Sequence, residues 1–147
     1  MPFRTDHVGL NVTDLDKSKN FYTRVFGFTV AAQSHEKDRQ SVFLAQDGGI
    51  VLTLWQQSRG SFSSSAPGLH HLSFQVANFD AVRATEKILR EIGAVVYHGG
   101  PVAHAEGTPS GGLFFEDPDG IRLEVFAPEG AEDLLTPTAG ATSCGFF

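Results

Sequence analysis

Three side chains of types that bind divalent metal ions, His7, His71 and Glu124, stand in segments with the alternating pattern of β-strands. In each segment the alternation places this side chain on the strand face opposite the apolar residues expected to pack against a helix. Two imidazoles and one carboxylate that project into one cavity form a ligand set that leaves positions open for water or substrate. The sequence therefore predicts a centre with one divalent metal ion, and Fe, Mn, Ni, Zn and Co all remain open.

Each of these three residues also has an ordinary structural explanation. A histidine at the start of a strand is usually a surface residue, and gene duplication would repeat it. Glu124 could be a salt-bridge partner of the nearby Arg122, because a carboxylate in an apolar strand is costly to bury unless it is paired or bound to a metal. The matched positions of all three on one face favour the metal centre. We leave out the four histidines that fall in loops, at a strand edge or on an apolar face: His35, His70, His98 and His104.

The elements that must position these side chains follow from an internal repeat. The segment HVGLNVTDLD, residues 7–16, aligns with HLSFQVANFD, residues 71–80, so that polar and apolar positions match. Apolar residues alternate with polar ones in the first half of each segment, and this period of two predicts a β-strand. His7 and His71 therefore occupy the same position in two copies of one unit.

Each strand leads into a helix and then into three further strands. Asp14 and Asn78 are suited to accept backbone N–H groups at a helix start, and Gly27 and Gly93 are suited to end the two helices. A β-rich stretch follows each helix, and an Asp-Gly turn at residues 47–48 indicates a hairpin. The expected strands after the helices are 28–30, 41–45 and 50–55 in the first copy, and 94–96, 113–116 and 121–126 in the second.

Both copies are thus βαβββ modules, and we predict an α+β fold. Module 1 spans residues 3–57 and module 2 spans 69–127, with a Ser/Gly-rich linker at 58–68. Since a module of about 60 residues has too little core to be stable alone, we expect both to form one domain over residues 1–127 with a cupped, mostly antiparallel sheet. Residues 128–147 form a tail whose apolar end, 144–147, either docks on the body or on a second chain, or is disordered.

Composition and charge exclude several classes of protein. The chain has 147 residues, 41% of them hydrophobic, and a net charge of −6. It lacks the basic surplus of a nonspecific nucleic-acid binder. It also lacks the apolar run of about 20 residues that spans a membrane and the pattern of a signal peptide, so we expect a cytoplasmic protein with no membrane partner. The single cysteine, Cys144, excludes an internal disulfide and a cysteine-based zinc site.

Several apolar side chains share the predicted ligand face. By strand alternation we expect a substrate cavity lined by Phe43, Val51, Trp55 and Phe126, which favours an aromatic or apolar small molecule. Thr53 stands where the first copy would repeat Glu124, and its hydroxyl is placed to bond a metal-bound water or a substrate oxygen. No residue stands out as a general acid or base, so the catalytic residues stay unassigned.

Taken together, these motifs resemble the vicinal oxygen chelate (VOC) superfamily, which holds glyoxalase I, bleomycin resistance proteins, fosfomycin resistance transferases and extradiol dioxygenases. The resemblance covers about residues 3–127 and rests on five segments: 6–12, 71–76, 17–22, 26–28 and 115–124. It implies a cupped sheet around a cavity, a homodimer that is frequently domain-swapped, and metal ligands at His7, His71 and Glu124. The length of the linker, residues 58–68, leaves open whether one chain or two build the site.

The resemblance also limits the activity. Thr53 replaces the fourth ligand expected of a glyoxalase I, and the segment 105–107 lacks a histidine expected of an extradiol dioxygenase, which also has a tyrosine where Phe114 stands. Fosfomycin transferases have a threonine where Gly9 stands. We expect a metal-dependent enzyme, a lyase, isomerase or transferase, that chelates vicinal oxygens of a small molecule and stabilises an oxyanion. The alternatives are a non-catalytic protein that sequesters an antibiotic or aromatic metabolite, and an extradiol-type dioxygenase.

Overall fold

The computed structural model describes residues 1–137 and 147. Residues 138–146, which include Cys144 and Phe146 of the expected apolar end, lie outside the described part. The chain divides into two compact units, Met1–Phe62 and Ser63–Phe147. In the described part, neither helix has the length and apolar character needed to cross a membrane.

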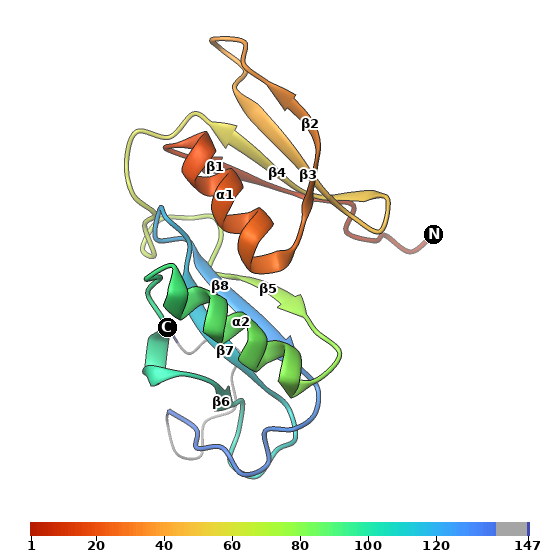
Figure 1. Ribbon diagram of the computed structural model, residues 1–147, viewed down its shortest axis with the longest axis vertical. Helices are drawn as coiled ribbons and strands as arrows, with labels where there is room; N and C mark the ends of the chain where they lie inside the picture. The colour runs from red at the N-terminus through yellow and green to blue at the C-terminus, as the bar shows by residue number, and fades with distance from the viewer. Residues whose placement is uncertain (138–146) are drawn as a thin grey trace. The chain divides into compact units, whose positions relative to one another are not determined.

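The first unit is a βαβββ module with one four-stranded sheet (Figure 1). The strands are ordered β1-β4-β3-β2; β1 is parallel to β4, and the other pairs are antiparallel. Helix α1 packs against β3 and β4. The elements are β1 (Val8–Val12), α1 (Leu15–Phe26), β2 (Thr29–Ser34), β3 (Ser41–Gln46) and β4 (Gly49–Gln56).

The second unit repeats this order with a second mixed sheet, β5-β8-β7-β6, in which β5 is parallel to β8. Helix α2 packs against β7 and β8. The elements are β5 (Leu72–Gln75), α2 (Phe79–Glu91), a 3-10 turn η1 (Tyr97–Gly99), β6 (Val102–Ala103), β7 (Gly111–Glu116) and β8 (Arg122–Ala127). The α+β fold with tandem βαβββ modules is confirmed, with a separate sheet in each module.

The predicted helix ends are also confirmed. Asp14 Oδ1 accepts the backbone N–H of Lys17 at 3.0 Å, and Asn78 Oδ1 accepts that of Ala81 at 3.1 Å. Gly27 and Gly93 follow the helices with φ values of 70° and 71°. Only glycine adopts this left-handed conformation without a penalty, so both residues suit the end of a helix. Gly27 directly follows α1, whereas Ile92 stands between the end of α2 and Gly93.

One predicted strand is wrong. Residues 94–96 form only an isolated bridge, between Val96 and Phe115, and the edge strand β6 begins later, at Val102. His98, Gly99 and Gly100 all have positive φ values. This backbone conformation is incompatible with an extended strand, so the chain turns before it reaches the sheet edge.

The core of each unit lies between its helix and one sheet face. In the first unit this face carries Leu10, Val12, Leu52 and Leu54, of which at most 5% is exposed. In the second unit it carries Leu113, Phe115, Leu123 and Val125, of which at most 1% is exposed. The register of the strands therefore leaves the opposite face of each sheet for the polar and aromatic residues of the expected site.

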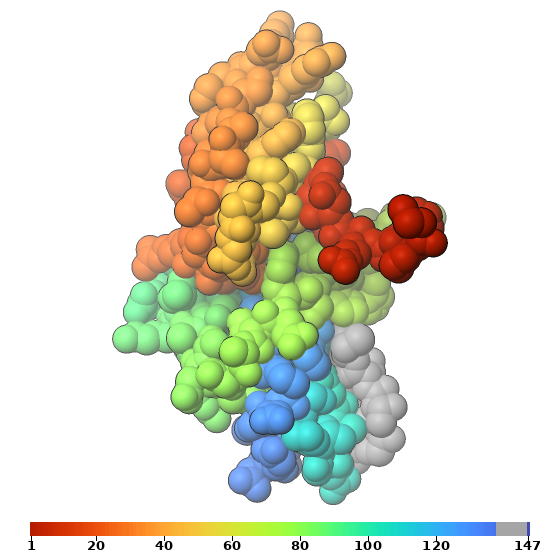
Figure 2. Space-filling view, turned by 90° about the vertical axis from the view of Figure 1, so that its right-hand side faces the viewer, coloured from red at the N-terminus to blue at the C-terminus, as the bar shows by residue number. Residues whose placement is uncertain are grey.

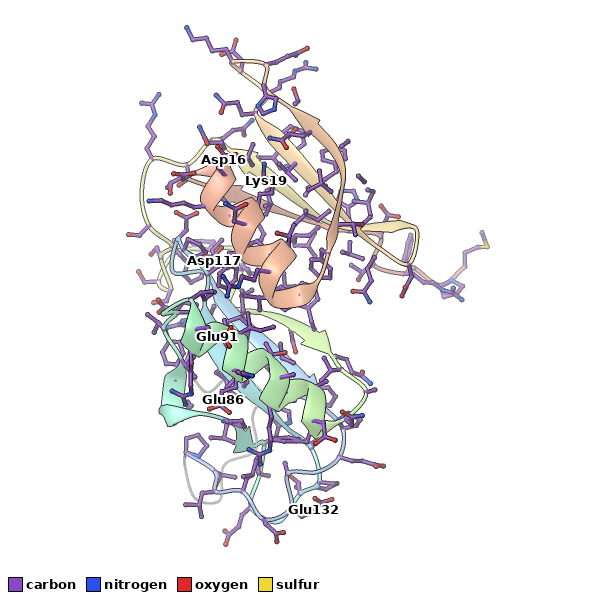
Figure 3. All side chains as sticks on the ribbon, viewed as in Figure 1. Asp16, Lys19, Glu86, Glu91, Asp117 and Glu132 are labelled. Atoms are coloured by element: carbon purple, nitrogen blue, oxygen red, sulfur yellow. The ribbon has the colours of Figure 1, made fainter. Side chains whose placement is uncertain are left out.

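Side-chain hydrogen bonds fix the turns. The hairpin between β3 and β4 turns at Asp47 and Gly48, which both have positive φ values, as an Asp-Gly turn requires. Asp117, labelled in Figure 3, is buried, and its Oδ1 accepts the N–H groups of Asp119 at 2.8 Å and Ile121 at 2.9 Å. This turn sets where β8 begins and so positions Glu124.

The beginning of the chain is exposed. In the space-filling view its residues, coloured red, stand out from the surface (Figure 2), and Met1 and Phe3 are fully exposed. The side chain of Phe3 is thus exposed to solvent, whereas Phe114 and Phe115 of the second unit are fully buried.

Candidate metal centre

The register of the second sheet places the two predicted ligands of this unit on one face. Ser73 of β5 pairs with Glu124 of β8, and Phe114 of β7 pairs with Glu124 from the other side. His71 directly precedes β5, two residues before Ser73, and so has its side chain on the face of Glu124. The Nε2 atom of His71 lies 3.6 Å from Glu124 Oε2.

Glu124 is a fully buried carboxylate with one unsatisfied oxygen. Its side chain is 0% exposed, and Oε2 has no hydrogen-bond partner. An unpaired charged oxygen in a protein interior is costly, and such atoms often mark a ligand or ion. Glu124 Oε2 and His71 Nε2 face each other at 3.6 Å. A small movement of the two side chains would allow both atoms to bind one metal ion.

The other oxygen of Glu124 is held by a histidine that the sequence analysis left out. His104 Nε2 lies 2.6 Å from Glu124 Oε1, and both side chains are buried. The ring of His104 stacks on Phe126, with centroids 5.2 Å apart and planes 14° apart. His104 Nδ1 lies 3.2 Å from Ser110 Oγ. These contacts fix His104, which in turn orients the carboxylate.

Gly112 of β7 has no side chain, and this leaves room for the carboxylate of Glu124. A Cβ atom on Gly112 would lie 3.0 Å from Glu124 Oε1 and 2.7 Å from the carbonyl oxygen of Val125. Both distances are shorter than ordinary contacts, so only glycine fits at this place in β7.

His71 is oriented by its neighbour in sequence, His70. The Nδ1 atoms of the two rings lie 2.8 Å apart, so this hydrogen bond leaves Nε2 of His71 free to face Glu124. Burial lowers the pKa of His71 below its ordinary value; Glu124 opposes this shift, while His70 and Arg122 add to it. A lowered pKa favours the neutral imidazole, which is the form that binds a metal.

In the first unit, the matching face carries the other predicted site residues. Thr53 of β4 pairs with Gly9 and Phe43, and it accepts a hydrogen bond of 3.1 Å from Trp55 Nε1. The rings of Phe43 and Trp55 lie 5.9 Å apart. Thr53 is buried, whereas Phe43, Val51 and Trp55 are half-buried.

His7 precedes β1 and is exposed, and its Nδ1 lies 2.6 Å from Asp6 Oδ2. Nε2 of His7 is therefore the ring nitrogen left for a ligand.

The structure brings together His71, Glu124 and Phe126 within the second unit, and Phe43, Val51, Thr53 and Trp55 within the first. Across residues 1–137 and 147, no group of three His, Cys, Asp or Glu side chains stands ready to hold a metal ion. A metal centre built on His71 and Glu124 would therefore need a further ligand. Sequence reasoning missed His104 because its segment has no long periodic pattern; the apolar pair Val102 and Ala103 just before it, which forms β6, was the available signal.

Comparison with known proteins gives the family. The sequence model of the Glyoxalase/Bleomycin resistance protein/Dioxygenase superfamily matches residues 4–125. A lactoylglutathione lyase of Neisseria meningitidis serogroup A is 28% identical over 137 residues, covering 88% of this chain and 94% of that protein. A catechol-2,3-dioxygenase of Bacillus subtilis is 27% identical over 127 residues, covering 82% of this chain but 41% of that protein.

The solved structures agree. The crystal structure of a glyoxylase/bleomycin resistance protein/dioxygenase domain from Frankia sp. EAN1pec matches with a TM-score of 0.75 and 26% identity, covering 88% of this chain and all of that one. The match of the family model over both βαβββ modules, together with this fold, leads to one conclusion. The chain belongs to the Glyoxalase/Bleomycin resistance protein/Dioxygenase superfamily.

Proposed function

We propose that this chain is a divalent-metal-dependent enzyme that acts on a small molecule by chelating two neighbouring oxygen atoms of it. The proposed ligands are His7, His71 and Glu124. The observation that carries the proposal is the buried Glu124 carboxylate, whose Oε2 has no hydrogen-bond partner and faces His71 Nε2 at 3.6 Å. A bound cation would satisfy this oxygen and offset the cost of its burial.

The two histidines support the proposal because each is bonded through Nδ1. His7 pairs with Asp6 and His71 with His70, so that Nε2 of each ring is left for a metal. Metal-binding histidines commonly have such a partner on the second ring nitrogen, which fixes their orientation. His7 belongs to the first unit and His71 to the second, and the proposal includes a homodimer in which the site is built within one chain or between two.

The chemistry of these ligands suits a Lewis acid. When bound, a divalent ion would polarise the substrate oxygens and stabilise negative charge that develops on them. Glu124, held through Oε1 by His104, would keep its other oxygen aimed at the centre. The aromatic side chains Phe43, Trp55 and Phe126 would bind the apolar part of the substrate and exclude water.

A second candidate function, an extradiol-type dioxygenase, is favoured by His104. The resemblance to that class implies a histidine within residues 105–107, and this segment of the chain contains none. His104 lies one residue earlier and reaches the carboxylate of Glu124. A redox-active iron at the centre would support this candidate, whereas Mn, Ni, Zn or Co would support lyase, isomerase or transferase chemistry.

Metal analysis of the full chain tests the proposal. Protein purified without added metal should contain about one divalent ion per chain, and His7→Ala, His71→Ala and Glu124→Gln should each lose it. His35→Ala is the matched control, because His35 is an exposed histidine outside the helices and strands and should leave the content unchanged.

Metal-free protein that also fails to bind any of the five ions on titration would overturn the proposal. If that protein bound aromatic compounds equally well with and without these substitutions, a non-catalytic binding role would replace the enzyme.

A further inference from the structure

The ring of Phe147 lies within a cluster of side chains in the second unit. Its centroid is 5.2 Å from that of Phe114, 5.4 Å from Tyr97 and 5.4 Å from His71. The guanidinium carbon of Arg122 lies 5.3 Å from the centroid of the Phe147 ring. We call Tyr97, Phe114, His71 and Arg122 the aryl cluster.

The aryl cluster is next to the proposed metal ligands. Phe114 pairs across the strands with Glu124, and Arg122 lies two residues before Glu124 on the same face of β8. His71 belongs to both groups, since its ring contacts Phe147 and its Nε2 faces Glu124 Oε2. A ring bound in the aryl cluster therefore lies beside the centre.

The contacts are of a kind that selects an aromatic ring. Phe114 and Tyr97 meet Phe147 edge to face, with interplanar angles of 83° and 82°. Such pairs, and a cation over a ring face, depend on the π-electrons of the ring, which a saturated ring of the same size lacks. Tyr97 is held in place by its hydroxyl, which donates to Glu116. The cluster is thus built on two strand residues, Phe114 and Arg122, on His71 directly before β5, and on a hydrogen-bonded tyrosine.

We propose that the aryl cluster is a subsite for an aromatic ring of the ligand, and that Phe147 of the same chain fills this subsite in the free protein. The inference names the ligand class of the proposed metal site and to that extent rests on the proposed function. Among the described residues, the ring of Phe147 makes the contacts that an aromatic ring of a ligand would make, so such a ligand competes with it. The apparent affinity for such a ligand is reduced by the fraction of molecules in which Phe147 occupies the subsite.

Two small alcohols with the same number of heavy atoms test the inference. Benzyl alcohol and cyclohexylmethanol have the same carbon skeleton, but the ring is flat and aromatic in the first and puckered and saturated in the second. We would titrate each into the full chain and follow the backbone amide signals of β7 and β8 by NMR. Phe147→Ala should bind benzyl alcohol about tenfold more tightly than the unchanged chain, because the competing ring is gone. Phe147→Leu, which keeps apolar bulk, should give a smaller gain.

Two further comparisons make the test specific. Phe3→Ala removes a fully exposed phenylalanine and should bind benzyl alcohol as the unchanged chain does. In the Phe147→Ala background, cyclohexylmethanol should bind several-fold more weakly than benzyl alcohol, and Arg122→Gln should reduce this preference about threefold. Equal affinity of Phe147→Ala and the unchanged chain for benzyl alcohol, or equal affinity of Phe147→Ala for the two alcohols, would overturn the inference.

The same preparations separate this inference from the proposed function. Their metal content is measured alongside the titrations, and Phe147→Ala should not change it. Tighter benzyl alcohol binding in a protein that neither holds nor takes up metal would support the subsite and overturn the metal-dependent function. A metal-containing protein in which Phe147→Ala has no effect on benzyl alcohol binding would do the reverse.

Discussion

His104 Nε2 and Glu124 Oε1 lie 2.6 Å apart, and both side chains are buried in the second unit. This contact satisfies one carboxylate oxygen and leaves the other facing His71. His104 therefore lowers the free-energy cost of burying Glu124 and fixes the direction of Oε2. The pair links the stability of the second unit to the geometry of the proposed centre.

Removing His104 should destabilise the metal-free protein. His104→Ala would leave the buried carboxylate without its hydrogen-bond partner, with only His71 Nε2 at 3.6 Å from Oε2. Removing one partner of a buried pair in this way costs about 3 kcal/mol or more. Chemical denaturation of the full chain in the presence of a chelator measures this loss. His35→Ala serves as the control, because His35 is exposed and lies outside the helices and strands, so it should change the free energy of unfolding by less than about 0.5 kcal/mol.

The double variant His104→Ala, Glu124→Gln separates the pair from simple packing. A neutral amide costs less to bury than a carboxylate. The double variant should therefore recover part of the free energy of unfolding that is lost in His104→Ala. Equal stability of His104→Ala and the unchanged chain would contradict the importance of the pair.

Gly112→Ala should disturb the carboxylate from the other side. Its Cβ would meet Glu124 Oε1 at 3.0 Å and the backbone of Val125 at 2.7 Å. We expect a loss of about 1–3 kcal/mol in the free energy of unfolding together with weaker metal binding. Gly60→Ala is the control, because a Cβ there meets nothing within 4 Å. A Gly112→Ala protein with unchanged stability and metal content would show that β7 can yield without moving Glu124.

Tyr97 should make stability depend on alkaline pH. Burial, and next Glu116, raise the pKa of its hydroxyl above the ordinary value of about 10. The unfolded chain therefore loses this proton first, so the stability due to Tyr97 is present below pH 10 and is lost as the pH rises through the raised pKa. Arg122 faces Tyr97 and opposes the shift.

Comparison with Tyr97→Phe isolates this group from the other tyrosine. At neutral pH the variant should be less stable by about 1 kcal/mol, the usual worth of one hydrogen bond. Unfolding midpoints in denaturant, measured from pH 8 to 11, about the range in which tyrosine ionises, should show this difference shrinking as the pH rises. A constant difference across the range would contradict a raised pKa.

The fold was predictable because its signals are local and appear twice. Each signal acts over only a few residues: the alternation in residues 7–12 and 71–76, the caps Asp14 and Asn78, and the Asp-Gly turn. Because most of these signals occur in both copies, each copy supported the prediction made from the other. The prediction failed where the copies differ. His98, Gly99 and Gly100 turn the chain, and the first copy has no matching segment that would have indicated this turn. For this reason residues 94–96 were wrongly predicted as a strand.

The site was predictable only in part, for a related reason. Strand alternation placed His71, Glu124, Arg122 and Phe126 on one face, and the register confirms this. His104 and Phe147 reach the same place from segments without periodicity, through contacts between side chains distant in sequence. No pattern of local spacing encodes such contacts. The assignment of His7, His71 and Glu124 as metal ligands stays a prediction.

His70 provides a test of how His71 is positioned. Its Nδ1 lies 2.8 Å from Nδ1 of His71, yet its side chain is exposed and outside the core. His70→Ala should therefore leave the free energy of unfolding within about 0.5 kcal/mol of the unchanged chain. It should weaken metal binding by about 10-fold or more, as the loss of a partner on the second ring nitrogen does. Competition with a metal-binding dye measures the affinity, and His35→Ala controls for the loss of an exposed histidine. If His70→Ala and His35→Ala bind metal with the same affinity, the contact between the two rings does not orient His71.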